Sequence, residues 1–398
     1  MRSLRVLSLS AVIAATLLAG CSSGTAPPPA AVAPASTSPT PAAVPDHSAA
    51  LTTAINAFID GEFQHNPVFA ANAGKHAFDG KLPDYSPAGL KATGDWLHAQ
   101  RASFAAFTDS QLDASGRFQR DYALAVIDGQ LFWLEDSGAP YNNPTWYSGD
   151  LSPSMYLSRP YAPLAERMAA FVTYQEALPK ALAQIKANLK LPLPASYIDV
   201  GVNTFAGFAS FFKTDVPGIF AEVKDPALQA RFKASNAAAI KASQDLADWL
   251  KAQKSHATQD YALGAEKFSK MLYATERVDL PLEQLKAIGE SDLARNLAAL
   301  KSACDQFAPG KSLTDCVARE SADKPVGGAV EGARKQLASL RQVIVDKDLV
   351  TIPGTEQAKA EEAPPFNRWN FAYIEIPGPY EQNLPSVYYI APPDPTWS

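Results

Sequence analysis

Hydrophobic residues recur along most of this chain at the spacing of one helical face. Between residues 282 and 300 they stand mostly three or four positions apart, and Pro281 precedes them, as suits the first turn of a helix. Segment 118–134 is apolar on more than one face, which predicts a buried helix. Segment 164–189 is predicted to form two helices joined at Pro179, because an interior proline removes a backbone hydrogen bond and clashes with the preceding turn. Further helices are predicted at 51–60, 87–107, 226–253, 260–273 and 330–345.

Strand patterns occur only late in the sequence, at 371–376 and 386–390. Side chains of the second strand alternate between its two faces, and both faces are apolar, so both need cover. Its four central residues are Val387, Tyr388, Tyr389 and Ile390. No alternation of strands and helices predicts a parallel sheet. The sequence therefore predicts a mostly α, multi-helix domain with a small β element near the C-terminus.

The N-terminus has the organisation of a secretion signal. Arg2 and Arg5 precede an apolar run that ends at Leu18 and is too short to span a bilayer as a mature helix. The run closes with Leu-Ala-Gly before Cys21, which resembles the bacterial lipobox. The resemblance implies a signal peptide over residues 1–20 and acyl chains, such as palmitate, on Cys21. An ordinary secretory signal with a nearby cysteine is the alternative.

The next segment is a spacer between this anchor and the folded part. Residues 25–45 have no charge, no aromatic side chain and many prolines, so they are expected to be extended. The predicted organisation is a lipidated cysteine with a Pro/Ala-rich linker at 21–46, then one helical domain at 47–398. Such a protein is expected in the cell envelope, tethered to a bacterial membrane by its lipid and facing the periplasm, with Ser22 favouring the outer membrane.

Composition narrows the classes of partner. Hydrophobic residues make up 47% of the chain, which excludes disorder for most of it. The net charge of −6 argues against a nucleic-acid partner, which favours a basic surface. Cys304 and Cys316 lie beyond the anchor, and an oxidising periplasm favours a disulfide between them, with free thiols as the alternative.

Candidate chemistry is scarce in the residues themselves. None of the 5 histidines has another four positions away, so the H-E-x-x-H pair of many zinc peptidases is missing. The histidines are His47, His65, His76, His98 and His256. Glu361 and Glu362 are adjacent but are expected in a solvated loop. From the residues alone we predict no catalytic residue, no metal ligand and no cofactor in this chain.

Three segments in order nevertheless resemble the bacterial domain of unknown function 885 family. The first has a Gly-x-His-x-aromatic-Asp element followed by Asp-x-Ser; its matching positions are Pro67, Gly74, His76, Phe78, Asp79, Asp84 and Ser86. The second joins a Gly-x-x-x-Phe helix to a helix that starts after a proline; its matching positions are Gly264, Phe268, Leu272, Leu285 and Gly289. The third is the C-terminal segment 369–397. Together they extend the resemblance across residues 46–398.

The resemblance implies a mostly helical protein similar to zinc metallopeptidases, with an H-E-x-x-H helix in the C-terminal portion. No such motif occurs here. We therefore expect a hydrolase-like chain that is truncated before its metal motif and inactive alone. Zinc is expected only in a full-length member of the family. Residues 387–390 are then expected to be an edge strand that pairs with an extended peptide substrate. Two alternatives stay open: a non-catalytic envelope lipoprotein for binding or assembly, and a fragment without function. The sequence assigns no oligomeric state.

Overall fold

Several helices begin where the sequence supplies a capping side chain. The computed structural model describes residues 47–352, 354–363 and 371–393. The Ser86 hydroxyl accepts a hydrogen bond from the Gly89 N–H at the start of helix α3 (Pro87–Ala105). The Asp225 carboxylate accepts hydrogen bonds from two backbone N–H groups at the start of α10 (Pro226–Ala252). Both helices have proline at the first position, where its missing N–H costs no hydrogen bond.

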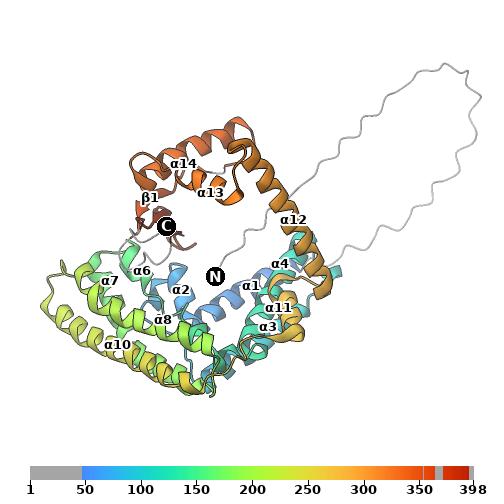
Figure 1. The fold of residues 1–398 in the computed structure, drawn as a ribbon. Helices are drawn as coiled ribbons and strands as arrows, with labels where there is room; N and C mark the ends of the chain where they lie inside the picture. Colours follow the sequence, from blue (N-terminus) through green and yellow to red (C-terminus); the bar gives the residue numbers. More distant parts are fainter. Residues whose placement is uncertain (1–46, 353, 364–370, 394–398) are drawn as a thin grey trace, which may run out of the picture. The chain divides into compact units, whose positions relative to one another are not determined.

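The fold is mostly helical, as predicted. Figure 1 shows the elements in order. The helices are α1 (Ser48–His65), α2 (Pro67–Asn72), α3 (Pro87–Ala105), α4 (Ala114–Leu131), α5 (Ala139–Asn142), α6 (Ser154–Ser158), α7 (Leu164–Asn188), α8 (Ala195–Thr214), α9 (Val216–Ile219), α10 (Pro226–Ala252), α11 (Gly264–Glu276), α12 (Leu282–Phe307), α13 (Leu313–Ser321) and α14 (Gly328–Asp346). The described residues all lie in one compact unit of the chain, Pro45–Ser398.

Two apolar clusters fill most of the helical body. The larger joins α7, α8 and α10, where rings such as Phe171, Phe205 and Phe212 are fully buried. The second joins α1, α3 and α4 around Phe104. Trp146 packs against both clusters. We use the name helical body for residues 47–252, which contain both clusters.

The predicted break at Pro179 is wrong, because α7 runs through it without interruption. Leu178 and Ala181 are buried on either side of the proline. Burying apolar side chains on both halves of the helix outweighs the hydrogen bond that the proline removes. The predicted burial of segment 118–134 is wrong on one face, since Phe118 and Tyr122 are exposed and stack on each other at 6.2 Å.

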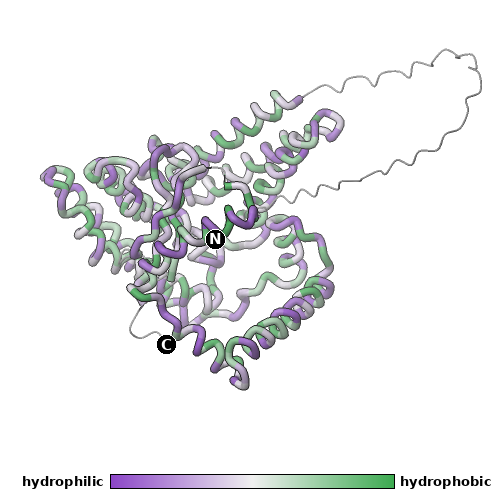
Figure 2. The backbone as a smooth tube through the Cα atoms, turned by 90° about the horizontal axis from the view of Figure 1, so that it is seen from above, coloured by the Kyte–Doolittle hydropathy of each residue, from purple (hydrophilic) through white to green (hydrophobic). Residues whose placement is uncertain are grey.

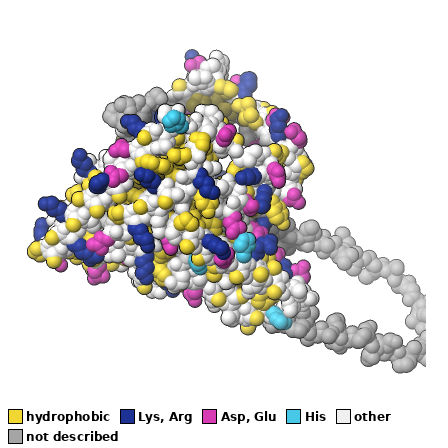
Figure 3. Space-filling model, turned by 90° about the horizontal axis from the view of Figure 1, so that it is seen from below, with side chains coloured by type: hydrophobic (Ala, Val, Ile, Leu, Met, Phe, Trp, Pro, Cys, Tyr) yellow, Lys and Arg dark blue, Asp and Glu magenta, His cyan; other side chains and the backbone are white. Residues whose placement is uncertain are grey.

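Helix α12 carries the predicted apolar stripe, but the stripe faces solvent. Leu293, Leu297 and Leu300 are 59%, 51% and 42% exposed. Figure 2 shows polar and apolar positions alternating along the helices, as amphipathic helices require. On the face of the molecule in Figure 3, apolar side chains reach the surface in patches among charged ones. No helix among the described residues is long and apolar enough to span a bilayer.

Near the C-terminus the described residues form a 3-stranded sheet of β1 (Lys359–Glu362), β2 (Ala372–Glu375) and β3 (Val387–Ile390). Its order is β1-β3-β2, with β1 parallel and β2 antiparallel to β3. The two predicted strands are present. The predicted loop at Glu361 is wrong, because this acidic segment forms β1; Arg334 donates hydrogen bonds to the Ala360 carbonyl and the Glu361 carboxylate.

The order of the sheet also corrects the prediction of an edge strand. Val387, Tyr388, Tyr389 and Ile390 form the central strand, with a partner strand on each side. Their backbone groups are committed to β1 and β2, so β3 has no open side on which a peptide substrate could pair. The prediction failed because the acidic residues of β1 gave no strand signal in the sequence.

Candidate functional site

The Gly-x-His-x-Phe-Asp element forms a tight turn after helix α2. Gly74 has a φ of +98°, in the left-handed region that favours glycine. His76–Phe78 then form one 3₁₀ turn, and the Phe78 ring packs 6.3 Å from that of Phe63 in α1. The apolar residue of the element therefore anchors the turn on the helical body, while its polar residues stay available for other contacts.

Asp79 and Tyr161 fix the imidazole ring of His76. His76 Nδ1 lies 3.2 Å from Asp79 Oδ1, and the ring stacks on Tyr161 with centroids 3.9 Å apart. The Tyr161 hydroxyl donates a hydrogen bond of 2.8 Å to Asp79 Oδ2. Burial and this carboxylate raise the pKa of the Tyr161 hydroxyl, so it stays protonated and serves as a donor. Both oxygens of Asp79 are thus used to orient the ring.

The other ring nitrogen of His76 faces the carboxylate of Glu381, whose side chain is only 3% exposed. Glu381 Oε2 accepts hydrogen bonds from Arg159 at 3.0 Å and from the Gly378 N–H at 2.5 Å. Glu381 Oε1 lies 3.5 Å from His76 Nε2, and neither atom has a hydrogen-bond partner among the described residues. We call His76, Asp79, Arg159, Tyr161 and Glu381 the His76–Glu381 cluster.

Two glycines let the backbones around this cluster approach closely. The Tyr380 N–H donates a hydrogen bond of 3.0 Å to the Ala73 carbonyl. A Cβ atom at Gly378 would lie 2.3 Å from the Ala73 carbonyl carbon, and one at Gly74 would lie 2.7 Å from Glu381 Cγ. Any side chain at either position would separate the segments, so both glycines are needed to bring Glu381 to His76.

The polar contacts continue onto strand β2. The Ser158 hydroxyl, at the end of α6, donates a hydrogen bond of 2.6 Å to Glu375 Oε1. Burial raises the pKa of the Glu375 carboxyl, and the hydrogen bond from Ser158 and the charge of Arg159 partly offset this rise. Residues 158 and 159 therefore contact two glutamates of the C-terminal segment.

A second group of buried carboxyls lies within the helical body. The Tyr85 hydroxyl donates a hydrogen bond of 3.1 Å to Asp150 Oδ2. Burial raises the pKa of the Asp150 and Glu62 carboxyls, and the charge of Asp150 raises that of Glu62 further. Glu62 Oε2 is buried without a hydrogen-bond partner among the described residues. Burial thus favours the protonated form of both carboxyls.

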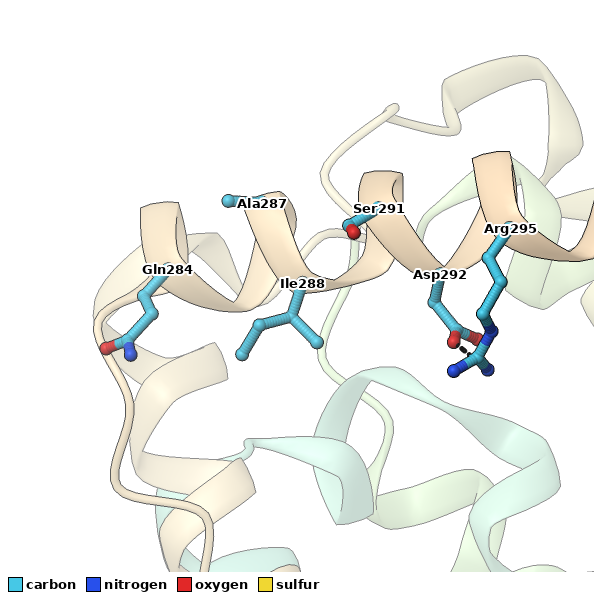
Figure 4. Close-up of a pocket in the computed structure, with 6 residues that line it drawn as sticks. All are labelled: Gln284, Ala287, Ile288, Ser291, Asp292 and Arg295. Carbon is cyan, nitrogen blue, oxygen red and sulfur yellow. Dashed lines mark ion pairs between the residues drawn. The ribbon is translucent and has the colours of Figure 1, made fainter.

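Neither group provides a zinc site. Over residues 47–352, 354–363 and 371–393, no three His, Cys, Asp or Glu side chains form a group that could hold a metal ion. A hollow on the surface lies elsewhere, along α12, and its lining residues all come from that helix, including Ile288 and the Asp292–Arg295 ion pair (Figure 4). The hollow contributes no titratable group beyond that pair, so the His76–Glu381 cluster is the stronger candidate site.

The site residues predicted from the sequence lie apart from this cluster. Cys21 is outside the described residues. Cys304 and Cys316 form a disulfide that joins α12 to α13. Two matched residues of the first segment, His76 and Asp79, do belong to the cluster, although sequence reasoning gave them no catalytic role.

The sequence model of one family, described as bacterial protein of unknown function (DUF885), matches residues 67–398. The chain belongs to the DUF885 family. A solved structure of a suspected lipoprotein of unknown function from Shewanella oneidensis has the same fold, with a TM-score of 0.66 and 22% sequence identity. The similarity covers 87% of this chain but 66% of that chain, so this chain spans just under two thirds of that relative. No curated protein matches the sequence.

Arg159, Tyr161 and Glu381 were missed by sequence reasoning. Glu381 lies in the third segment of the DUF885 resemblance, three residues after Gly378. The first and third DUF885 segments are thus in contact, through His76 and Glu381. Gly74 in the first segment and Gly378 in the third are the signal that could have suggested a close approach between the two segments.

Proposed function

We propose that this chain is a lipid-anchored protein of the cell envelope and supplies the helical part of a DUF885 zinc-dependent peptidase. The observation that carries the proposal is the family match over residues 67–398. In this proposal the metal-binding helix comes from polypeptide other than these 398 residues, and the chain has no peptidase activity by itself. The membrane is its partner through the lipid, and a peptide is its substrate in the complete enzyme.

Two partly exposed apolar side chains on one face of the C-terminal sheet support this proposal. Ile374 of β2 is 49% exposed and Tyr388 of β3 is 36% exposed, and these two side chains lie opposite each other in the register. Such apolar side chains favour a covering layer. The Shewanella relative is long enough to have one, since a third of that chain lies outside the similarity.

Zinc content tests the peptidase proposal. We expect the purified chain to bind no stoichiometric zinc and to cleave no peptide in a mixed library. A version extended through any downstream reading frame is expected to bind one zinc ion and to lose peptidase activity with a chelator. Tightly bound zinc in the 398-residue chain, removed together with activity by a chelator, would contradict the proposal.

Lipidation is tested separately at Cys21. Acyl chains on this residue hold the protein on a membrane, because two or more chains give stable anchoring. We expect Cys21→Ser to leave the protein unprocessed or to move it into the soluble fraction of the envelope. Cys304→Ser is the control and is expected to fractionate with membranes like the wild type. A Cys21→Ser protein that matures and stays in the membrane fraction would contradict lipidation.

A non-catalytic binding or assembly role is the alternative, favoured by the exposed apolar side chains of α12. A binding protein would use such a surface for another protein. The extended version separates the two functions: peptidase activity with bound zinc supports the enzyme, while a stable complex with an envelope protein and no activity supports the binding role.

A further inference from the structure

Charged side chains, more than apolar ones, attach the C-terminal sheet to the helical body. The apolar clusters of the helices contain no described residue of β1, β2 or β3. The turn between β2 and β3 makes an aromatic contact through Tyr380, whose ring lies 5.9 Å from that of Phe63. The other contacts described above are polar and come from the Ala73 carbonyl and the side chains of His76, Ser158 and Arg159.

We propose that Glu381 is a latch. Its carboxylate, held by Arg159 and facing His76, keeps the C-terminal sheet docked, and strands β2 and β3 with the turn between them open when the latch is released, while the helical body stays folded. The latch does not depend on peptidase activity. It concerns residues 371–391, which we call the latch segment, with β2 and β3 at its two ends.

The local structure lowers the free energy needed to open this segment separately from the helical body. Each strand is only 4 residues long, and such a small sheet has little stability once it loses its support. Regions with few buried apolar contacts open locally at a lower free energy than the core. Ile374 and Ile376 are about half exposed even when the sheet is docked, so these two side chains lose little apolar burial when the segment opens.

Glu381 provides the carboxylate of the latch segment that hydrogen-bonds Arg159, while Glu375 of the same segment interacts with the charge of Arg159 without such a bond among the described contacts. The Glu381 carboxylate satisfies Arg159, whose side chain is only 14% exposed, and it accepts the N–H of Gly378. Hydrogen bonds to charged partners are stronger than neutral ones, and removing one partner leaves the other charge buried and unpaired. His76 Nε2 and Glu381 Oε1 have no hydrogen-bond partner among the described residues, so the latch is held mainly from the Arg159 side.

Hydrogen exchange of the purified full chain tests the latch. Glu381→Gln keeps the size of the side chain but removes its charge. We expect peptides covering 371–391 to exchange at least tenfold faster in this variant, while peptides of α7 and α10 keep their wild-type rates. Glu176→Gln is the matched control: Glu176 pairs with Arg231 at 2.6 Å between exposed faces of α7 and α10, and its substitution should leave the latch segment unchanged.

Two results would overturn the proposal. Unchanged exchange in residues 371–391 would show that Glu381 does not hold the sheet. Equal acceleration in the latch segment and in α7 would show that the sheet and the helical body unfold together. Ser158→Ala provides a milder variant if Glu381→Gln fails to fold, since it removes the hydrogen bond to Glu375 and the local bond to the Ser154 carbonyl in α6 but leaves the Glu381 carboxylate in place. It should accelerate exchange in the latch segment alone, by a smaller factor, and no acceleration there would count against the latch.

Discussion

Some residues of the helical body have carboxyl groups that are buried away from water and have few hydrogen-bond partners. Glu62 and Asp150 are the plainest case, because burial raises both pKa values and Glu62 Oε2 has no described hydrogen-bond partner. A raised carboxyl pKa favours the protonated form in the folded state. The stability that such a carboxyl contributes is therefore present in full at pH values below the pKa of the unfolded chain, about 4. It is lost as the pH rises through the higher pKa of the folded state.

Glu62→Gln should accordingly stabilise the protein at neutral pH. The amide keeps the size of the side chain without a charge, so we expect an increase of about 1 kcal/mol in the free energy of unfolding, or a rise of about 2 °C in Tm, at pH 7.5. The gain should shrink towards pH 4, where the wild-type carboxyl is protonated. Thermal unfolding followed by circular dichroism across this pH range measures both effects.

Glu176→Gln is the control with the opposite sign. The hydrogen bond from Arg231 lowers the pKa of Glu176, so its contribution to stability is present above the unfolded pKa and lost as the pH falls. Because this pair is exposed, the substitution should change the free energy of unfolding only slightly, and not upwards. A Glu62→Gln variant no more stable than the wild type at pH 7.5 would show that the buried carboxyl is solvated after all.

Among the elements, helix α7 shows how tertiary packing overrides a local signal. Pro179→Ala restores the backbone N–H at this position and removes the ring that crowds the preceding turn. We expect the free energy of unfolding to rise by about 1–2 kcal/mol, less than the full cost of about 3 kcal/mol for an interior proline, because alanine also increases the freedom of the unfolded chain. Denaturant unfolding measures the change, and a loss of stability would show that α7 requires its proline.

The disulfide between α12 and α13 is a second test at this scale. It closes a loop with a sequence separation of 12, which should contribute about 2–4 kcal/mol to the segment it joins. Replacing both cysteines by serine should accelerate hydrogen exchange in α13 while α7 and α10 keep their rates. Mass analysis of an unreduced digest should show the two peptides linked in the wild type. Free thiols in protein purified from the periplasm would contradict the disulfide.

The elements also show what the sequence can and cannot predict. The helices were predictable because their apolar residues recur every three or four positions, as in α12. Strand β1 was not, because Lys359 and its acidic neighbours form a strand only by pairing with β3. The cluster was not predictable either: Arg159 and Glu381 are 222 residues apart, and no local pattern encodes a contact over such a distance.

At the scale of the whole molecule, many large apolar side chains outside the helical body are exposed to solvent. The stripe of α12 and exposed side chains of α14, such as Leu340, belong to none of the apolar clusters formed by the described residues. Contiguous exposed patches of this kind mark interaction surfaces or cause association. Scattered exposed residues such as Val326 carry no such meaning.

The α12 stripe should therefore make the purified chain associate with itself as its concentration rises. Leu293, Leu297 and Leu300 follow one another at intervals of four and three, the spacing with which two helices pack against each other. We expect sedimentation velocity to show a shift from monomer to larger species between micromolar and hundred-micromolar protein. Leu297→Gln with Leu300→Gln should weaken that association by at least tenfold, because each buried leucine contributes about 1.5–3 kcal/mol. Val326→Gln, at an exposed position outside the stripe, should leave it unchanged. A wild-type chain that stays monomeric throughout this range would show that the stripe alone does not drive self-association.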